Sequence, residues 1–209
     1  MRDSVPTTEQ QLRRVVVGEL NPLNGPVVLV DYDPTWPKNF AREDRRITAA
    51  LGARALRIEH IGSTSVPGLV AKPIIDIVLV VADSADEASY LPPLEAAGYV
   101  LRIREPDWHQ HRLLKGPDTN VNLHVFSLGS GEIERVLQLR DRLRTNGADR
   151  ELYARTKRGL ARRKWKFTQN YADAKSEVVE AILARAKLST PRGPRRSGSV
   201  GPSARRKPR

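Results

Sequence analysis

The sequence predicts an α+β fold, with a strand-rich first half and an all-helical second half. Between residues 56 and 126, short apolar or alternating runs are separated by turns rich in Gly, Pro and Asp, a pattern typical of β-strands. Residues 131–188 are instead rich in Ala, Leu, Arg, Lys and Glu, with almost no Gly or Pro, and this composition favours helices. A chain of 209 residues is long enough to bury one full hydrophobic core.

The first elements lie before residue 56. Residues 1–26 are mostly polar and predict a helical or loose lead-in, and the apolar residues 27–30 predict a short strand. Pro37 suits the first turn of a helix. We expect that helix to end at Gly52 and to carry an apolar stripe, which consists of Phe40, Ile47 and Leu51.

A strand, a turn and a second strand follow. Residues 56–61 alternate between apolar and polar side chains, which predicts a half-buried strand that leads directly into a turn at Gly62 and Ser63. A short irregular or helical segment is expected at 64–71. Residues 73–81 are apolar on both faces, so we expect this strand at the centre of the sheet.

The remaining elements complete the sheet and the helical half. Residues 83–86 predict the start of a helix that the Pro92–Pro93 pair interrupts and that Gly98 ends. Three further strands are expected, at 99–104, 110–115 and 121–126. Three helices are expected after them, at 131–146, 149–166 and 169–188.

The net charge of +12 is concentrated at the end of the chain. Residues 191–209 carry seven Lys or Arg and no Asp or Glu, so +7 of the +12 belongs to them. The segment 189–209 is also rich in Gly, Pro and Ser, which predicts a disordered basic tail. Two interpretations stay open. The tail either adds weak, salt-sensitive contact with RNA or DNA or is a solvated segment without a role.

The composition also bears on where the protein works. The sequence contains no Cys, so neither disulfides nor thiolate metal sites are possible. No apolar stretch approaches the roughly 20 residues that a membrane-spanning helix needs, and residues 1–6 have no apolar core of the kind found in secretory signals. We therefore expect a cytoplasmic protein without a membrane partner.

A carboxylate inside an apolar strand is the strongest functional signal. Asp76 interrupts the apolar residues 73–81, and a buried charge is costly unless something compensates it. A bound metal ion is the functional explanation, and a backbone or Arg partner is the structural one. Upstream, the Gly62-Ser63 turn either brings backbone N–H groups to a phosphate or is only a turn. Lys72 either contacts phosphate or is an ordinary surface lysine.

The four histidines all lie between residues 60 and 124. On the strand 121–126, Asn122 and His124 share one face. If that strand neighbours the strand 73–81, His124 comes within reach of Asp76, where it would ligate the same metal or act as a base. The structural alternative is a hydrogen-bonded core histidine.

Other polar residues form two weaker candidates for substrate contact. His109 and His111 would share one strand face and, with Arg112, make an anion- or base-contacting patch, although their spacing is not that of a metal motif. His60 either orients the Gly-Ser turn against the substrate or caps its strand.

The helical half offers two Tyr–Lys pairs at helical spacing. Tyr153 and Lys157 are four residues apart, as are Tyr171 and Lys175, so each pair shares a helix face. These faces would bind a nucleotide base or phosphates across a cleft, or they are solvated helix surface.

Several of these motifs together resemble the GrpB family. The resemblance spans about residues 27–186, and its matching segments are Asp33-Pro34 with Trp36-Pro37, 59–69, 72–77, His111-Arg112, 122–126 and, more weakly, 171–175. It implies the nucleotidyltransferase superfold typified by polymerase beta, a small mixed β-sheet flanked by helices with a helical C-terminal part. The implied domain is 27–188, with its sheet at about 27–128 and its helices at about 130–188.

The resemblance also implies a chemistry. In that superfold a Gly-Ser turn precedes Asp-x-Asp or Asp-x-Glu on the next strand, a third carboxylate follows later, and the carboxylates hold two Mg²⁺ ions. Gly62, Ser63 and Asp76 match this pattern. Val78 occupies the second carboxylate position, and the later strand offers His124 or Asn122, so the sequence departs from the usual ligand set.

The leading interpretation is a nucleotidyltransferase that uses Mg²⁺ or Mn²⁺ to transfer a nucleotidyl group from a nucleoside triphosphate to an unknown acceptor. Asp76 and His124 would be its catalytic and metal-binding residues, and the phosphate-binding residues would be Gly62, Ser63, Thr64, Ser65 and Lys72. One alternative is a nucleotide- or RNA-binding module without catalysis, which Val78 favours. Another is a metal-dependent hydrolase built on the histidines, which needs more carboxylates near them than the sequence offers.

Overall fold

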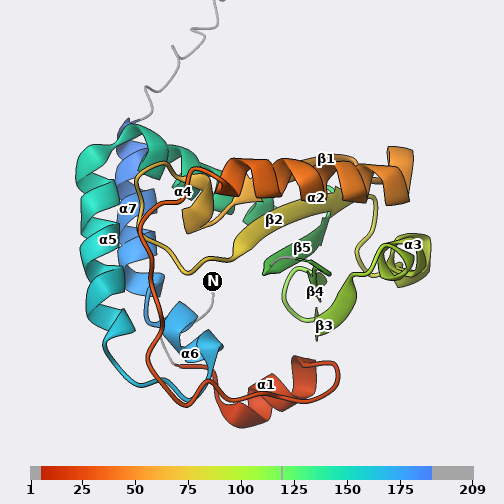
Figure 1. The fold of residues 1–209 in the computed structure, drawn as a ribbon, viewed down its shortest axis with the longest axis horizontal. Coiled ribbons are helices and arrows are strands. Elements are labelled where there is room, and N and C mark those ends of the chain that lie inside the picture. Colours follow the sequence, from red (N-terminus) through yellow and green to blue (C-terminus); the bar gives the residue numbers. More distant parts are fainter. Residues whose placement is uncertain (1–5, 119, 190–209) are drawn as a thin grey trace, which may run out of the picture.

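The computed structural model describes residues 6–118 and 120–189. At its centre is a five-stranded sheet in the order β1-β2-β5-β4-β3 (Figure 1). β2 and β5 run parallel, and all other neighbouring strands are antiparallel. The predicted α+β class with a small mixed sheet is therefore confirmed. The strands are β1 Arg57–Ile61, β2 Ile75–Val81, β3 Val100–Glu105, β4 His111–Lys115 and β5 Val121–Ser127.

The α-helices divide between the two halves of the chain (Figure 1). α1, α2 and α3 accompany the sheet, and α4 to α7 follow it. As the sequence predicts, Pro37 lies in the first turn of α2 and Gly52 follows its last residue. The α-helices are α1 Glu9–Val15, α2 Trp36–Leu51, α3 Leu91–Ala96, α4 Gly131–Thr145, α5 Gly147–Ala161, α6 Thr168–Asp173 and α7 Ser176–Ser189.

Both faces of the sheet are covered, which explains the apolar sequence of β2. On one face Ile77 and Leu79 pack in a cluster with side chains of α2 and α3. On the other face Val78 and Val80 pack against α4. Because successive residues of a strand point to opposite faces, an interior strand of this kind is apolar throughout, apart from Asp76.

Two predictions about the sheet half are wrong in detail. Residues 27–30 do not form a strand of the sheet, because only Val30 pairs, in a single antiparallel bridge with Ala71. The Pro92–Pro93 pair does not interrupt a helix. It lies in the first turn of α3, where a missing N–H costs nothing.

The helical half also departs from the predicted boundaries. The segment after Ala161 leaves the helix early, and Trp165 bridges to Gly25 instead. The last predicted helix is two helices, α6 and α7, and no Gly or Pro marks the break. Tertiary contacts hold α6 apart, since Asn170 Nδ2 donates to the Thr7 carbonyl oxygen and Asp173 Oδ2 accepts from the Thr7 N–H, at 2.8 Å in each case.

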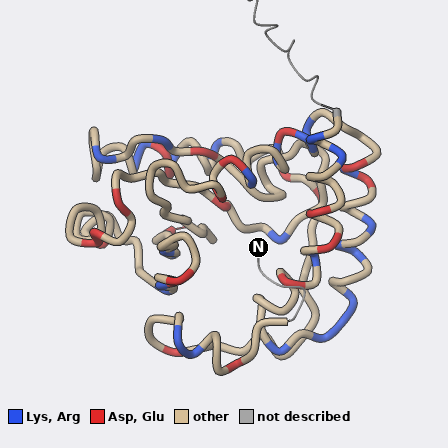
Figure 2. The backbone as a smooth tube through the Cα atoms, turned by 180° about the vertical axis from the view of Figure 1, so that it is seen from behind, with Lys and Arg blue, Asp and Glu red and all other residues tan. Residues whose placement is uncertain are grey.

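Charge is distributed over the whole described fold. Lys and Arg positions are interspersed with Asp and Glu positions along both halves of the backbone (Figure 2). Among the described residues, no helix is both long enough and apolar enough to cross a membrane. The predicted basic tail lies outside the described residues, apart from Ser189 at the end of α7.

Candidate functional site

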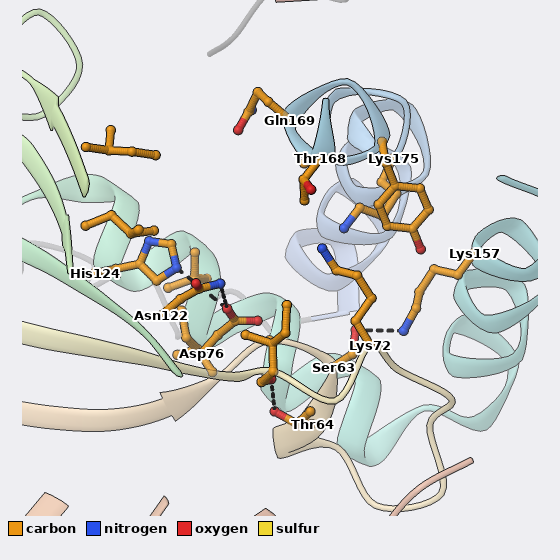
Figure 3. A pocket seen from close by; sticks show the side chains of 18 of the residues that line it. Ser63, Thr64, Lys72, Asp76, Asn122, His124, Lys157, Thr168, Gln169 and Lys175 are labelled. Atoms are coloured by element: carbon orange, nitrogen blue, oxygen red, sulfur yellow. Dashed lines mark hydrogen bonds and ion pairs between the residues drawn. The ribbon is translucent and has the colours of Figure 1, made fainter. Parts of the chain in front are cut away.

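A cavity of about 460 Å³ lies between the sheet and the helical half. Figure 3 shows that polar side chains from both halves point into it. Asp76 is its only carboxylate among the described residues. The polar side chains that line the cavity include Ser63, Thr64, Lys72, Asp76, Asn122, His124, Lys157, Thr168, Gln169 and Lys175.

The Gly62-Ser63 turn brings the backbone against the Asp76 side chain. Gly62 directly follows β1 and has φ +68°, and a Cβ built on it would lie 2.4 Å from Asp76 Oδ2. Glycine is therefore required twice, for the left-handed backbone and for the close approach. The short 3₁₀ helix Ser63–Ser65 then directs the Ser63 hydroxyl towards Lys157.

Asp76, Asn122 and His124 come together because β2 and β5 are neighbours in parallel register. Asp76 is paired with Asn122, and Val78 with His124. Asn122 Nδ2 donates to Asp76 Oδ1 at 2.7 Å, and His124 Nε2 lies 3.8 Å from the same oxygen. Burial raises the pKa of Asp76, but His124, the Asn122 hydrogen bond and Lys72 outweigh it, so the pKa is lowered. Asp76 is accordingly a carboxylate at neutral pH.

Two further residues extend this group away from the cavity. His111 Nε2 is 3.0 Å from His124 Nδ1, and His111 Nδ1 is 2.7 Å from Glu105 Oε2. With Glu105 ionised, His111 donates from Nδ1 and accepts at Nε2, and His124 then carries its proton on Nδ1. In the neutral imidazole the lone pair of His124 Nε2 then lies on the cavity side, as a general base requires. A proton accepted there gives the imidazolium, which is the form of His124 that stabilises the Asp76 carboxylate.

Three lysines from separate elements form the opposite side of the cavity (Figure 3). Lys157 of α5 is 2% exposed, donates to Ser63 Oγ at 2.8 Å and donates to the Val70 carbonyl oxygen. Lys72 precedes β2, and Lys175 lies between α6 and α7. The Nζ atoms of Lys72 and Lys175 lie 5.5 and 4.8 Å from the Tyr171 ring centroid.

The environment of these lysines disfavours their positive charge. Burial, and after it the nearby Lys175, lowers the pKa of Lys157 to about 7 and that of Lys72 to about 8, against the attraction of Asp76. Burial likewise lowers the pKa of Lys175. Within the described residues no carboxylate forms an ion pair with any of the three. An anion with several charges would compensate them.

The residues present do not make a site for two resident metal ions. Among the described residues no group of three or more His, Asp or Glu side chains is placed to hold a metal. Val78 is fully buried in the apolar cluster against α4. Asp76 is the only carboxylate that the described residues place in the cavity, and an Mg²⁺ ion there would take its other ligands mainly from water and from the phosphates of a substrate.

Three predicted substrate contacts lie elsewhere. His111 is 3% exposed and is engaged with His124 and Glu105 behind the cavity wall. Arg112 points to the opposite face of the sheet, where its Nε donates to Glu87 at 2.5 Å. His60 also faces away and stacks on Phe40 at a centroid distance of 4.9 Å. Strand alternation explains the last two, because each lies one residue from a position that faces the cavity.

Of three other predicted residues in this region, Thr64 lines the cavity, whereas Ser65 and His109 do not. Thr64 lines the cavity, but its Oγ1 donates to the Ile74 carbonyl oxygen and contacts His60 Nε2. The Ser65 hydroxyl donates to the Gly62 carbonyl oxygen at 2.6 Å, which stabilises the turn and directs it away from the cavity. His109 does not share a strand face with His111, because it lies in the turn before β4.

Some cavity residues carried little or no signal in the sequence. The Tyr–Lys spacing pointed to Tyr153, Lys157, Tyr171 and Lys175 without distinguishing them from solvated helix faces, and the structure places all four in the cavity lining. Thr168 and Gln169 of α6 also line it, and no local pattern marked them. The same holds for residues of the N-terminal segment, which closes one side of the cavity.

Comparison with known proteins agrees with the fold and the motifs. The family model described as GrpB protein matches residues 26–185. A UPF0157 protein of Halalkalibacterium halodurans is 60% identical over 184 residues, 88% of this chain and 94% of its own length. The crystal structure of GrpB from Enterococcus faecalis superposes with a TM-score of 0.67 at 30% identity, and covers 76% of this chain and 96% of that one.

A shorter match leads to a differently named protein. A dephospho-CoA kinase of Mycolicibacterium paratuberculosis is 46% identical over 77 residues, which are 35% of this chain and 19% of the kinase.

The family model covers most of the described residues, including the Gly62 turn, Asp76, His124 and the three lysines. This chain therefore belongs to the GrpB family.

Proposed function

We propose that the cavity binds a nucleoside triphosphate and that the protein transfers a nucleotidyl group from it to an acceptor. The observation that carries this proposal is the convergence of Lys72, Lys157 and Lys175 on a cavity whose only described carboxylate is Asp76. Three buried or half-buried ammonium groups that have no ion-pair partner among the described residues favour a ligand with several negative charges, and a triphosphate has that charge.

In this proposal different parts of the cavity bind different parts of the nucleotide. The β- and γ-phosphates bind the lysines, with the Ser63 hydroxyl beside them. The α-phosphate faces Asp76 and His124. Thr168 and Gln169 line a third side, where their polar groups suit the nucleoside (Figure 3). The dephospho-CoA kinases that share a segment with this chain are consistent with a ligand that carries phosphate.

The transfer step uses His124 as the base. An acceptor hydroxyl oxygen forms a bond to the α-phosphorus, and the bond from that phosphorus to the β-phosphate oxygen breaks, so pyrophosphate leaves with the electron pair. The hydroxyl proton goes to His124 Nε2. We further propose that Mg²⁺ or Mn²⁺ enters with the triphosphate as part of the substrate and that Asp76 is its protein ligand.

Replacing Asp76 by Asn separates transfer from binding. We expect Asp76→Asn to lower pyrophosphate release by about a hundredfold or more, because a reacting-centre carboxylate is lost. Triphosphate binding at the lysines stays within a few-fold. The measurement is metal-dependent pyrophosphate release beside thermal shift with each of the four nucleoside triphosphates.

The rival function is nucleotide binding without catalysis, and the apolar Val78 at the second carboxylate position favours it. It predicts a thermal shift that persists in EDTA and in Asp76→Asn, together with no pyrophosphate release from the wild type. RNA binding through the basic tail stays a prediction, since the tail lies outside the described residues. A cytoplasmic location also stays a prediction.

The lysine pKa values predict how triphosphate affinity depends on pH. The ligand binds the charged lysines, whose pKa values in the free protein are about 7 for Lys157 and about 8 for Lys72. As pH rises from 7 to 9 the free protein loses these charges, so we expect affinity to fall about tenfold or more. Calorimetry with a non-hydrolysable nucleotide would measure this, and unchanged affinity over that range would contradict it.

The lowered pKa values of Lys157 and Lys72 also affect the stability of the free protein, which they make rise with pH while triphosphate affinity falls. Their folded-state pKa values lie below the ordinary lysine value of 10.5. Between about pH 7 and 10 the unfolded chain therefore binds more protons than the folded one, and these lysines make the free energy of unfolding rise with pH.

A further inference from the structure

Beyond His124 the cavity changes from polar to apolar. Its wall continues across the sheet through residues that are paired one with the next. His124 of β5 lies opposite Leu113 of β4, Leu113 lies opposite Ile103 of β3, and Ile103 bridges to Val16. Leu12 of α1 completes this apolar end of the cavity, which consists of Leu12, Val16, Ile103 and Leu113.

The spacing of strands gives this apolar end a length. Neighbouring strands lie about 4.8 Å apart, so Leu113 begins about 5 Å from His124, and Ile103 and Val16 continue the surface for about 10 Å more. The lysines lie on the other side of Asp76 and His124 (Figure 3). The order across the cavity is thus lysines, reacting residues, apolar end.

The apolar end depends on the segment before the family domain. Residues 6–25 precede the matched range 26–185, and they connect the sheet edge to the helical half (Figure 1). Val17 N–H donates to the Arg102 carbonyl oxygen at 2.9 Å on the sheet side. At the other end, Thr7 N–H donates to Asp173 of α6. Leu12 is 6% exposed, so it is packed inward.

In-line transfer determines what occupies the apolar end. In phosphoryl-group transfer the attacking and leaving oxygens lie roughly opposite each other. If pyrophosphate leaves towards the lysines, the acceptor approaches from the far side of Asp76 and His124, where the apolar end lies. Its hydroxyl contacts His124, and its remaining atoms contact Leu113, Ile103, Val16 and Leu12.

We propose that the acceptor is a small alcohol or phenol with an apolar body, and that the N-terminal segment 6–25 selects it. This inference rests on the proposed function. A nucleic-acid end or a sugar would place polar groups against Leu12, Val16, Ile103 and Leu113, where they would lose hydrogen bonds to water without replacement. The selection is therefore by burial of apolar surface on one side of His124.

The test uses the full chain and benzyl alcohol as the apolar probe, with glycerol as the polar one. Saturation-transfer NMR should detect benzyl alcohol and not glycerol at equal concentration. Leu12→Ala should weaken benzyl alcohol about fivefold, since buried methyl groups are lost. Val16→Thr should weaken it severalfold while keeping shape and fold. Val28→Thr is the matched control, because Val28 is 71% exposed.

Nucleotide binding is measured by thermal shift on the same samples and should stay within twofold in all three variants. If the nucleotide binds but benzyl alcohol does not, the inference is overturned and the proposed function stands. A loss of nucleotide affinity in Leu12→Ala and Val16→Thr also overturns it, because the apolar end would then hold the nucleoside. If no nucleotide binds the wild type, the proposed function itself fails, and the inference with it.

Discussion

Lys157→Met is expected to weaken nucleoside triphosphate binding by roughly a hundredfold. Lys157 is the most deeply buried of the three cavity lysines, at 2% exposure, and its ammonium group lies beside Ser63 Oγ at 2.8 Å. Removing one partner of a desolvated charge pair costs about 2–5 kcal/mol, and a factor of ten in affinity corresponds to about 1.4 kcal/mol. A hundredfold loss, about 2.8 kcal/mol, lies in the lower half of that range.

The fold should tolerate this change. Met is unbranched and fills irregular apolar space, and the Tyr153 ring already packs near the Lys157 ammonium, 5.2 Å from its centroid. The lost hydrogen bond to the Val70 carbonyl oxygen costs about 1 kcal/mol, and removing a buried positive charge offsets it.

Calorimetric titration with a non-hydrolysable nucleotide would measure the effect. Lys164→Met removes the same charge from an exposed position after α5 and should change affinity less than twofold. Equal affinities of Lys157→Met and wild type would exclude the lysine side of the cavity as the phosphate site. Loss of affinity in both variants would indicate general charge attraction, which is screened by salt.

The second large effect is expected from Gly62→Ala. An added Cβ would lie 2.4 Å from Asp76 Oδ2 and 3.0 Å from Asp76 Cβ, and the backbone has φ +68°. The variant therefore has to displace either the turn or Asp76, in addition to the cost of a left-handed backbone, which is about 1 kcal/mol or more. We expect a loss of about 2–4 kcal/mol in the free energy of unfolding and loss of pyrophosphate release.

Gly52→Ala is the matched control for this variant. Gly52 also has a left-handed backbone, φ +55°, but a Cβ there would meet nothing within 4 Å. Denaturant unfolding of both variants isolates the contact with Asp76 from backbone strain. If the two variants lose equal stability and both keep activity, the close approach of Gly62 to Asp76 has no functional importance.

The sequence determined most of the architecture, because local patterns carry that information. The alternation at 56–61, the double-sided apolar run at 73–81 and the Gly-Pro-Asp turns located all five strands to within about two residues. The run from Gly62 to Asp76 predicted that the turn and the carboxylate share a site. The family was recognisable from the same residues, and the match over 26–185 confirms it.

Only the tertiary structure decided which polar residues face the cavity. His111, Arg112 and His60 all carry chemistry in the sequence. Arg112 and His60 face away from the cavity, since a shift of one residue along a strand sends a side chain to the other face. His111 is instead held behind the cavity wall by Glu105 and His124. The lysines illustrate the converse. Lys157 lies on α5 and Lys175 lies between α6 and α7. No sequence pattern placed either lysine opposite Asp76, since their approach depends on how the helical half packs beside the sheet.

The dependence on tertiary packing also explains why some parts of the site could be predicted from the sequence and others could not. Gly62 and Asp76 lie on consecutive elements, so the sequence predicted that they share a site. It placed His124 near Asp76 only on the condition that their two strands are neighbours, and the structure supplies that pairing. The N-terminal segment closes the cavity through contacts between residues more than eighty positions apart, such as Val17 with Arg102. Contacts at that separation leave no periodic trace in a single sequence, because each segment is compatible with many partners until the whole core is packed.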